Sequence, residues 1–118
     1  MAPAYAVPRM LDRAGLTLQD FDLYEIHEAF AAQVLCTLKA WESKDFCRTK
    51  LNRSPLGKID RKKMNPVGSS VAIGHPFAAT GARIVATLAK ELAQRGSGRG
   101  LISICAAGGM GVTAILER

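Results

Sequence analysis

Residues 77–118 restrict the fold more than any other part of the sequence. The stretch FAATGARIVATLAKELAQRG places Ile84, Leu88 and Leu92 at helical spacing and ends on Gly96, a residue suited to close a helix. Two apolar runs follow, GLISICA and GVTAILER, and the glycines between them indicate a turn. The pattern predicts a helix followed by two adjacent strands.

The remaining segments extend this pattern to an α/β fold. We expect helices over 2–15 and 28–41 and strands over 21–26 and 67–73, from the spacing of their apolar residues. This order of elements is typical of a layered α-β-α fold with a mixed sheet. A complete α/β domain normally begins with a strand, whereas this chain begins with a helix. We therefore expect residues 1–118 to form one partial domain, a half-fold that is incomplete at its N-terminal side.

Composition narrows the function classes. The chain is 48% hydrophobic and 22% charged, which is typical of a globular protein. No apolar run approaches the ~20 residues of a membrane-spanning helix, and no secretory signal is evident. Cys36, Cys47 and Cys105 lack the spacing of a metal site, and their odd number argues against a disulfide framework. We expect free thiols, no metal, no membrane span and a reducing, cytoplasmic location.

A basic segment, residues 44–66, carries the net charge of the chain. It holds eight Lys and Arg side chains against Asp45 and Asp60, and this surplus equals the formal net charge of +6. It has no sustained hydrophobic period, so we expect a long excursion. Three explanations fit this charge: a solvated loop, a phosphate-bearing ligand or an acidic partner. We favour the solvated loop. Phe46 is its only aromatic residue, so we expect no nucleic-acid partner.

Three polar signals stand at the carboxyl ends of predicted strands. His27 and His75 each follow one strand, and Cys105 ends another. Ligands bind beyond the carboxyl ends of strands in α/β sheets, and neighbouring strands would bring the three side chains together. Pro76 suits the first position of the following helix, which would place His75 near the positive end of the helix dipole. A thiolate or an oxyanion is stabilised there.

Each signal also has a structural explanation. A single histidine at a strand end is usually a surface residue or a satisfied core residue. A single cysteine in a strand is usually a small buried hydrophobic residue, and the GGMG glycines can serve a hairpin turn. The conjunction of both histidines with a cysteine favours a site.

Three motifs resemble the C-terminal motifs of the thiolases. They are HEAFAAQ, NPVGSSVAIGHPFAATGAR and CAAGGMG, and the resemblance runs over essentially the whole chain. Thiolases cleave 3-ketoacyl-CoA with coenzyme A or condense two acetyl-CoA in reverse. His27 stands where many members have asparagine. A histidine at this position is similar to the fatty-acid-oxidation branch of the family, the β-subunit type of trifunctional complexes. The resemblance implies acyl transfer in β-oxidation, with CoA and acyl-CoA as substrates and no cofactor.

The resemblance also assigns roles to residues. Cys105 matches the acid/base cysteine, and His75 matches the histidine that activates the nucleophile and donates to the thioester oxyanion. His27 matches the residue that holds a water in the same oxyanion hole. The backbone N–H of Ala107 would contribute to a second hole, next to Gly108, where the glycines let a thioester come close. Ala29 and Phe30 would line the pantetheine channel.

The nucleophilic cysteine of the family lies in an N-terminal half that is not found in this sequence. Cys36 lies within a predicted helix and Cys47 within the basic segment, so neither fits. We therefore expect the chain alone to be inactive and its partners to be the missing N-terminal half, a second copy and, in the β-subunit type, a multifunctional α-subunit. The alternative is a non-catalytic module that binds CoA or a partner subunit.

Overall fold

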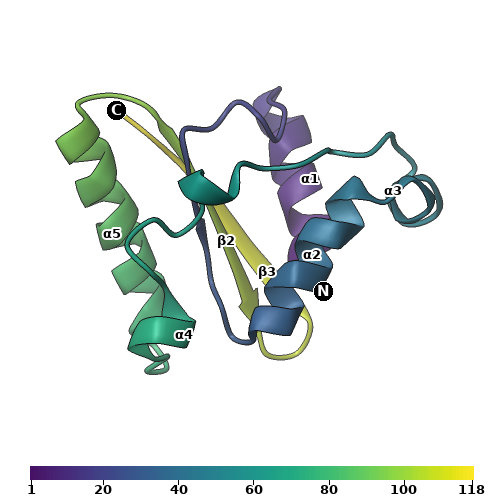
Figure 1. Cartoon of the computed structure of the whole chain (residues 1–118). Helices are drawn as coiled ribbons and strands as arrows, with labels where there is room; N and C mark the ends of the chain where they lie inside the picture. The colour runs from purple at the N-terminus through teal and green to yellow at the C-terminus, as the bar shows by residue number, and fades with distance from the viewer.

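The computed structural model describes all 118 residues and has helices on both sides of one sheet (Figure 1). The structure confirms the three predicted helices, the strand predicted at 21–26 and the two predicted C-terminal strands. The elements are α1 Pro3–Ala14, β1 Leu23–Ile26, α2 Ala31–Glu42, α3 Lys44–Leu51, the 3-10 turn η1 Arg61–Lys63, α4 Ser70–Ile73, α5 Thr80–Arg95, β2 Arg99–Ala106 and β3 Met110–Glu117.

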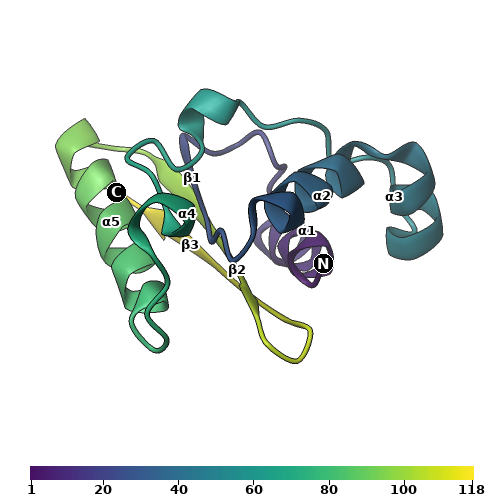
Figure 2. The same cartoon turned by 60° about the horizontal axis from the view of Figure 1, so that its bottom comes forward.

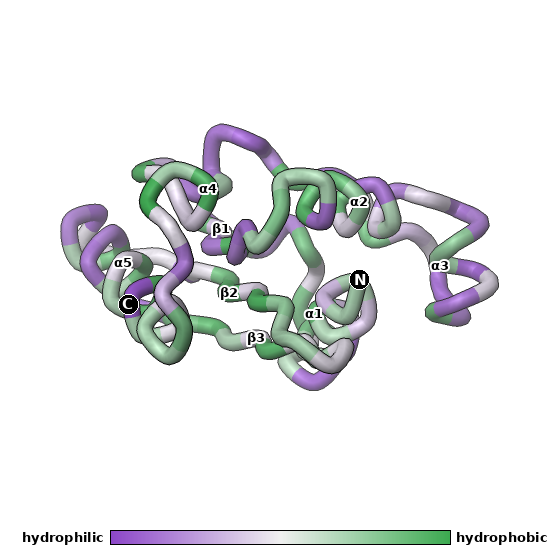
Figure 3. Tube along the Cα trace, turned by 90° about the horizontal axis from the view of Figure 1, so that it is seen from below, coloured by the Kyte–Doolittle hydropathy of each residue, from purple (hydrophilic) through white to green (hydrophobic).

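The strands form one mixed sheet in the order β1-β2-β3. β1 runs parallel to β2, with Tyr24 opposite Leu101, and β2 runs antiparallel to β3, with Leu101 opposite Ile115. Helices α1 and α2 lie on one side of the sheet and α5 on the other, which gives three layers (Figure 3). The predicted layered α/β fold with a mixed sheet is confirmed. No helix has the length and apolar character needed to cross a membrane.

Two apolar cores lie on opposite faces of the sheet. The larger packs α1 and α2 on the strands, and its members include Val7, Leu11, Tyr24, Ile26, Val34, Leu38, Trp41 and Leu101. The smaller packs α5 on β2 through Ile84, Leu88, Leu92 and Ile102. A Cβ at Gly100 would come within 2.5 Å of Leu88, so glycine at that position lets α5 approach the sheet. Because side chains alternate along β1, Glu25 and His27 face α5.

The strand predicted over 67–73 is wrong, because residues 70–73 form the short helix α4. Gly68 and Gly74, with φ of +85° and +95°, bracket this turn. The outer edge of β1 is occupied by residues 64–65 instead. Asn65 donates through Nδ2 to the carbonyl of Ile26 and accepts its N–H through Oδ1, at 2.9 and 2.8 Å. The backbone of residues 64–65 and the Asn65 side chain thus pair with this edge of β1.

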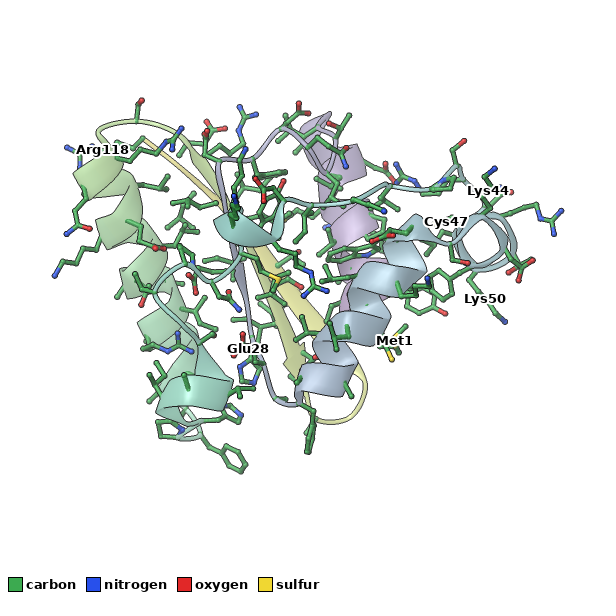
Figure 4. All side chains as sticks on the ribbon, in the orientation of Figure 1. Met1, Glu28, Lys44, Cys47, Lys50 and Arg118 are labelled. Carbon is green, nitrogen blue, oxygen red and sulfur yellow. The ribbon has the colours of Figure 1, made fainter.

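The basic segment is more ordered than a long excursion, since it contains α3 and η1. Ser43 caps α3 by accepting the N–H of Phe46, and Asn52 ends it with φ of +51°. Neighbouring acids pair with several of its cations, in Arg48–Asp45, Arg53–Asp12 and Lys58–Glu42. Figure 4 places Lys44 and Lys50 of α3 at one end of the molecule, away from Glu28.

Candidate active site

The structure brings the two histidines together beyond the carboxyl end of β1. His27 follows β1 directly, and its N–H continues the parallel pairing by donating to the carbonyl of Ser103 at 2.9 Å. His75 lies in the loop that joins α4 to α5 at one end of α5 (Figure 2). The ring centroids are 4.3 Å apart. Two strands and one loop, rather than three strands, therefore supply the predicted cluster.

His27 is buried, with 1% of its surface exposed. Its Nδ1 lies 2.8 Å from the hydroxyl of Ser70, whereas its Nε2 is buried without a partner. Burial lowers the pKa of His27, and the neighbouring His75 and Arg83 lower it further. A pKa below the ordinary 6.5 favours the neutral ring at pH 7, and the buried Nε2 has no hydrogen-bond partner.

His75 is exposed and is held by the first residue of α5. Its Nδ1 lies 2.6 Å from the hydroxyl of Thr80. The prediction that Pro76 opens this helix is wrong, because Ala78, with φ of +66°, turns the chain and α5 begins at Thr80. The Thr80 hydroxyl donates to the carbonyl of Pro76 at 3.2 Å, so His75 Nδ1–H is the donor to Thr80. His75 Nε2 is then an unprotonated nitrogen that can accept a proton.

Cys105 lies near the end of β2, half-buried, at a pocket of about 290 Å³. Its thiol donates to Gln33 Oε1 of α2 at 3.6 Å. The pocket has mostly apolar walls and one imidazole, and its lining includes His75, Phe77, Thr80, Ile104, Cys105 and Ala107. A thiol and an imidazole thus share one small, mostly apolar cavity, where charge interactions are stronger than in water.

Of the other predicted contact residues, Ala107 lines this pocket, whereas Ala29, Phe30 and Gly108 do not. Phe30 is 74% exposed just before α2, and Ala29 beside it is half-buried. Gly108 lies in the β2–β3 turn with φ of +81°, and a Cβ there would meet no atom within 4 Å. The glycine is required by the turn, and the space above it is open. The substrate-binding roles of Ala29, Phe30, Ala107 and Gly108 stay predictions.

The other two cysteines lie apart from the pocket. Cys47 is a fully buried residue of α3, and its thiol lies 3.4 and 3.6 Å from the carbonyl oxygens of Ala40 and Trp41. Cys36 is exposed on α2, and all three thiols are free. Neither Cys36 nor Cys47 lines the cavity of Cys105, so Cys105 is the one thiol in its lining.

A second cavity, of about 550 Å³, lies between α1 and β3. Arg9, Met10, Arg13 and Thr113 are among its lining residues. It contains no thiol, imidazole or carboxylate, so it offers none of the groups that acyl transfer requires.

Sequence reasoning missed the residues that hold the histidines in place. Ser70 and Thr80 each bond one imidazole, and Gln33 bonds the thiol. Glu28 ties the end of β1 to α4 by accepting from Asn65 Nδ2 at 2.9 Å and from the N–H of Val71 at 3.1 Å. These partners are polar residues of ordinary type, and the sequence carries no signal that distinguishes them from solvent-facing ones.

Replacing Glu25 by glutamine is expected to remove a pH dependence of stability. Burial, then the Glu91 carboxyl, raises the pKa of Glu25 to about 8 from an ordinary value of 4.5, against the lowering effect of Arg83. The folded chain therefore keeps a proton that the unfolded chain has lost. The resulting contribution to the free energy of unfolding is complete below pH 4.5 and is lost as the pH rises through 8. The expected slope is at most about 1.4 kcal/mol per pH unit.

Urea unfolding at about pH 5 and about pH 9 measures this effect. The Glu25→Gln chain is expected to resemble the unmodified chain near pH 5 and to exceed its free energy of unfolding near pH 9. Glu117→Gln, at an exposed carboxyl on β3, is the control and should not change the slope. A difference between Glu25→Gln and the unmodified chain that is the same at both pH values would contradict the prediction.

Comparison with known proteins gives one consistent family. The "Thiolase, C-terminal domain" family matches residues 1–118. The 3-ketoacyl-CoA thiolase of Photorhabdus laumondii subsp. laumondii is 52% identical over 99% of this chain and 27% of that protein. The 3-ketoacyl-CoA thiolase of Yersinia pestis (strain Pestoides F) is 53% identical over the same shares. The crystal structure of the Bacillus anthracis acetyl-CoA acetyltransferase has a TM-score of 0.79 and 40% identity over 98% of this chain and 25% of that one. This chain spans about a quarter of the length of these relatives.

Proposed function

Since this chain belongs to the thiolase family, whose C-terminal domain it matches over residues 1–118, we propose that it carries part of an acyl-transfer site for CoA thioesters. The observation that carries the proposal is the cluster of His27, His75 and Cys105. The two imidazole rings lie 4.3 Å apart, and the thiol shares a pocket with His75.

The proposed reaction is thiolysis of a 3-ketoacyl-CoA. A cysteine thiolate attacks the 3-keto carbonyl, the bond to the acetyl-CoA fragment breaks, and the Cα of that fragment takes up a proton. The CoA thiol then loses its proton, and its sulfur attacks the acyl-cysteine thioester to release acyl-CoA. The first half of the reaction thus needs a group that gives a proton to Cα of the acetyl-CoA fragment. The second half needs a group that takes the proton of the CoA thiol.

Three side chains of this chain take the proposed roles. Cys105 gives the proton to Cα and takes the proton from the CoA thiol. His75 removes the proton of the nucleophilic thiol through its free Nε2. His27 stabilises the thioester oxyanion, directly or through a water, from its unpartnered Nε2. The N–H of Ala107 serves the oxyanion of the second substrate, and Ala29, Phe30 and Gly108 border the CoA path.

The nucleophile is proposed to come from an N-terminal thiolase half. Neither Cys36 nor Cys47 reaches the pocket, and large apolar side chains near the histidines are uncovered. Phe77, Val67 and Val71 are 86%, 67% and 65% exposed. A second polypeptide segment over these side chains would bury them and close the site to water.

We place the reaction in fatty-acid β-oxidation. The similarity to relatives named 3-ketoacyl-CoA thiolase supports this, as does the resemblance of HEAFAAQ to the fatty-acid-oxidation branch. The exposed lysines of α3 lie away from Glu28 and the histidine loop (Figure 4). Solvent or an acidic partner, such as a multifunctional α-subunit, is therefore a better match for these lysines than the substrate phosphates.

The 118-residue chain alone is expected to show no thiolysis of acetoacetyl-CoA or of longer 3-ketoacyl-CoA. Without a nucleophile beside Cys105, the acyl-enzyme route is absent. The positive control is a thiolase chimera, in which this chain replaces the matching residues of the Photorhabdus laumondii thiolase. It is expected to restore turnover.

The same experiment distinguishes the proposed acyl-transfer function from a second candidate function. In this second candidate, the chain is a non-catalytic module that binds CoA or a partner. The absence of a second thiol from the pocket favours that candidate. An inactive but folded chimera supports the module. Turnover by the chain alone, with an acyl adduct on Cys36 or Cys47, contradicts the proposed division of the site.

A further inference from the structure

A chain of polar contacts runs from α5 to the buried ring of His27. Arg83 of α5 donates through Nη2 to the hydroxyls of Ser70 and Ser69, at 3.1 and 3.4 Å. The Ser70 hydroxyl lies 2.8 Å from His27 Nδ1. Glu25, the residue two before His27, faces the same helix and acts electrostatically on Arg83. Ser69 and Ser70 therefore both contact the guanidinium, but only Ser70 contacts the imidazole.

The protons of this chain can be assigned by counting donors. A guanidinium only donates, so the Ser70 oxygen is an acceptor toward Arg83. The single proton of that hydroxyl then has His27 Nδ1 as its acceptor at 2.8 Å. A neutral imidazole whose Nδ1 accepts carries its proton on Nε2. His27 Nε2 is buried with no partner, so its proton is a donor that is left unpaired in this structure.

We propose that Arg83 and Ser70 are positioning residues that fix His27 as the neutral Nε2–H tautomer, so that His27 serves the site as a hydrogen-bond donor and not as a base. This inference rests on the proposed acyl-transfer function, because the acceptor it implies is a thioester oxygen or a water bound to it. A fixed neutral donor stabilises a developing oxyanion without moving a proton. His75 is then the only imidazole that removes the proton of the nucleophile.

The tautomer can be measured on the full 118-residue chain labelled with 15N-histidine. Long-range 1H–15N correlation distinguishes a protonated ring nitrogen from an unprotonated one, and only His27 and His75 contribute. A His75→Gln chain assigns the signals. At a pH where both rings are neutral, His27 is expected to show a protonated Nε2 and an unprotonated Nδ1. The opposite pattern in the unmodified chain overturns the proposal without need of any further variant.

Variants then test the two positioning residues. Ser70→Ala and Arg83→Met are expected to shift both His27 nitrogens toward the average of the two tautomers. Ser70→Thr keeps the hydroxyl and should restore the pattern, and Ser69→Ala is the matched control that should not disturb it. An unchanged tautomer in Ser70→Ala, with an amide spectrum that reports a folded chain, contradicts the role of Ser70.

Activity of the thiolase chimera separates this inference from the proposed function. Ser70→Ala is expected to lower kcat about tenfold with little change in KM, less than the 10²–10³-fold typical for loss of an oxyanion donor itself. A chimera that is inactive while His27 shows the expected tautomer overturns the proposed function only. An active chimera with the opposite tautomer overturns this inference only.

Discussion

Cys105→Ala in the thiolase chimera is expected to lower steady-state thiolysis about 10²–10⁴-fold, the usual cost of losing a general acid/base. The acyl-enzyme should still form, because the nucleophile and His75 are intact and water can replace Cys105 as the proton donor to Cα. Its breakdown should stall, since no group remains to take the proton of the CoA thiol. Loss of 3-ketoacyl-CoA and intact mass of the accumulated acyl-enzyme measure the two steps.

The matched control is Cys36→Ala, which removes an exposed thiol of α2 outside the pocket. That variant should keep the rate of the unmodified chimera. A Cys105→Ala chimera with a normal turnover rate, or one that accumulates no acyl-enzyme while it stays folded, is incompatible with the acid/base role.

His75→Ala in the same chimera is expected to slow formation of the acyl-enzyme by about 10³-fold or more. Proton removal from the nucleophile and stabilisation of the oxyanion fail together, and each is worth about two or more orders of magnitude. Stopped-flow or rapid-quench measurement of the first turnover gives the acylation rate directly. Lys90→Ala, which removes an exposed side chain of α5, is the control and should leave that rate unchanged.

An acylation rate in His75→Ala close to that of the unmodified chimera contradicts the role of His75. If only the second half-reaction slows, His75 and Cys105 have been assigned to the wrong steps.

The sequence predicted the parts of the fold that have a strong local pattern. Ile84, Leu88 and Leu92 at helical spacing correctly predicted the helix α5, and the apolar runs around the glycine turn correctly predicted β2 and β3. The strand predicted over 67–73 failed for a physical reason. Its place beside β1 is taken by residues 64–65, including the side chain of Asn65, and no periodicity reveals a side chain that pairs with a backbone.

The site was predictable in its chemical members but not in its supports. Two histidines and a cysteine at the ends of apolar runs indicated a cluster, and the structure places the two rings 4.3 Å apart. The contact of Ser70 with His27 joins residues 43 apart in the sequence and depends on how α5 sets Arg83 against α4. Contacts of that kind follow from tertiary packing, which a single sequence does not display.

His75 and Cys105 are proposed to move different protons of one thiolase reaction, and a trapping experiment distinguishes their roles. Chimeras that carry His75→Ala or Cys105→Ala are mixed with a 3-ketoacyl-CoA that is radiolabelled in its acyl part, and the reaction is quenched within a single turnover. We expect label to accumulate on the Cys105→Ala protein, at a cysteine outside the 118 residues described here, and to appear about 10³-fold more slowly on His75→Ala. Equal labelling rates in the two variants, or label on Cys36 or Cys47, would contradict the account.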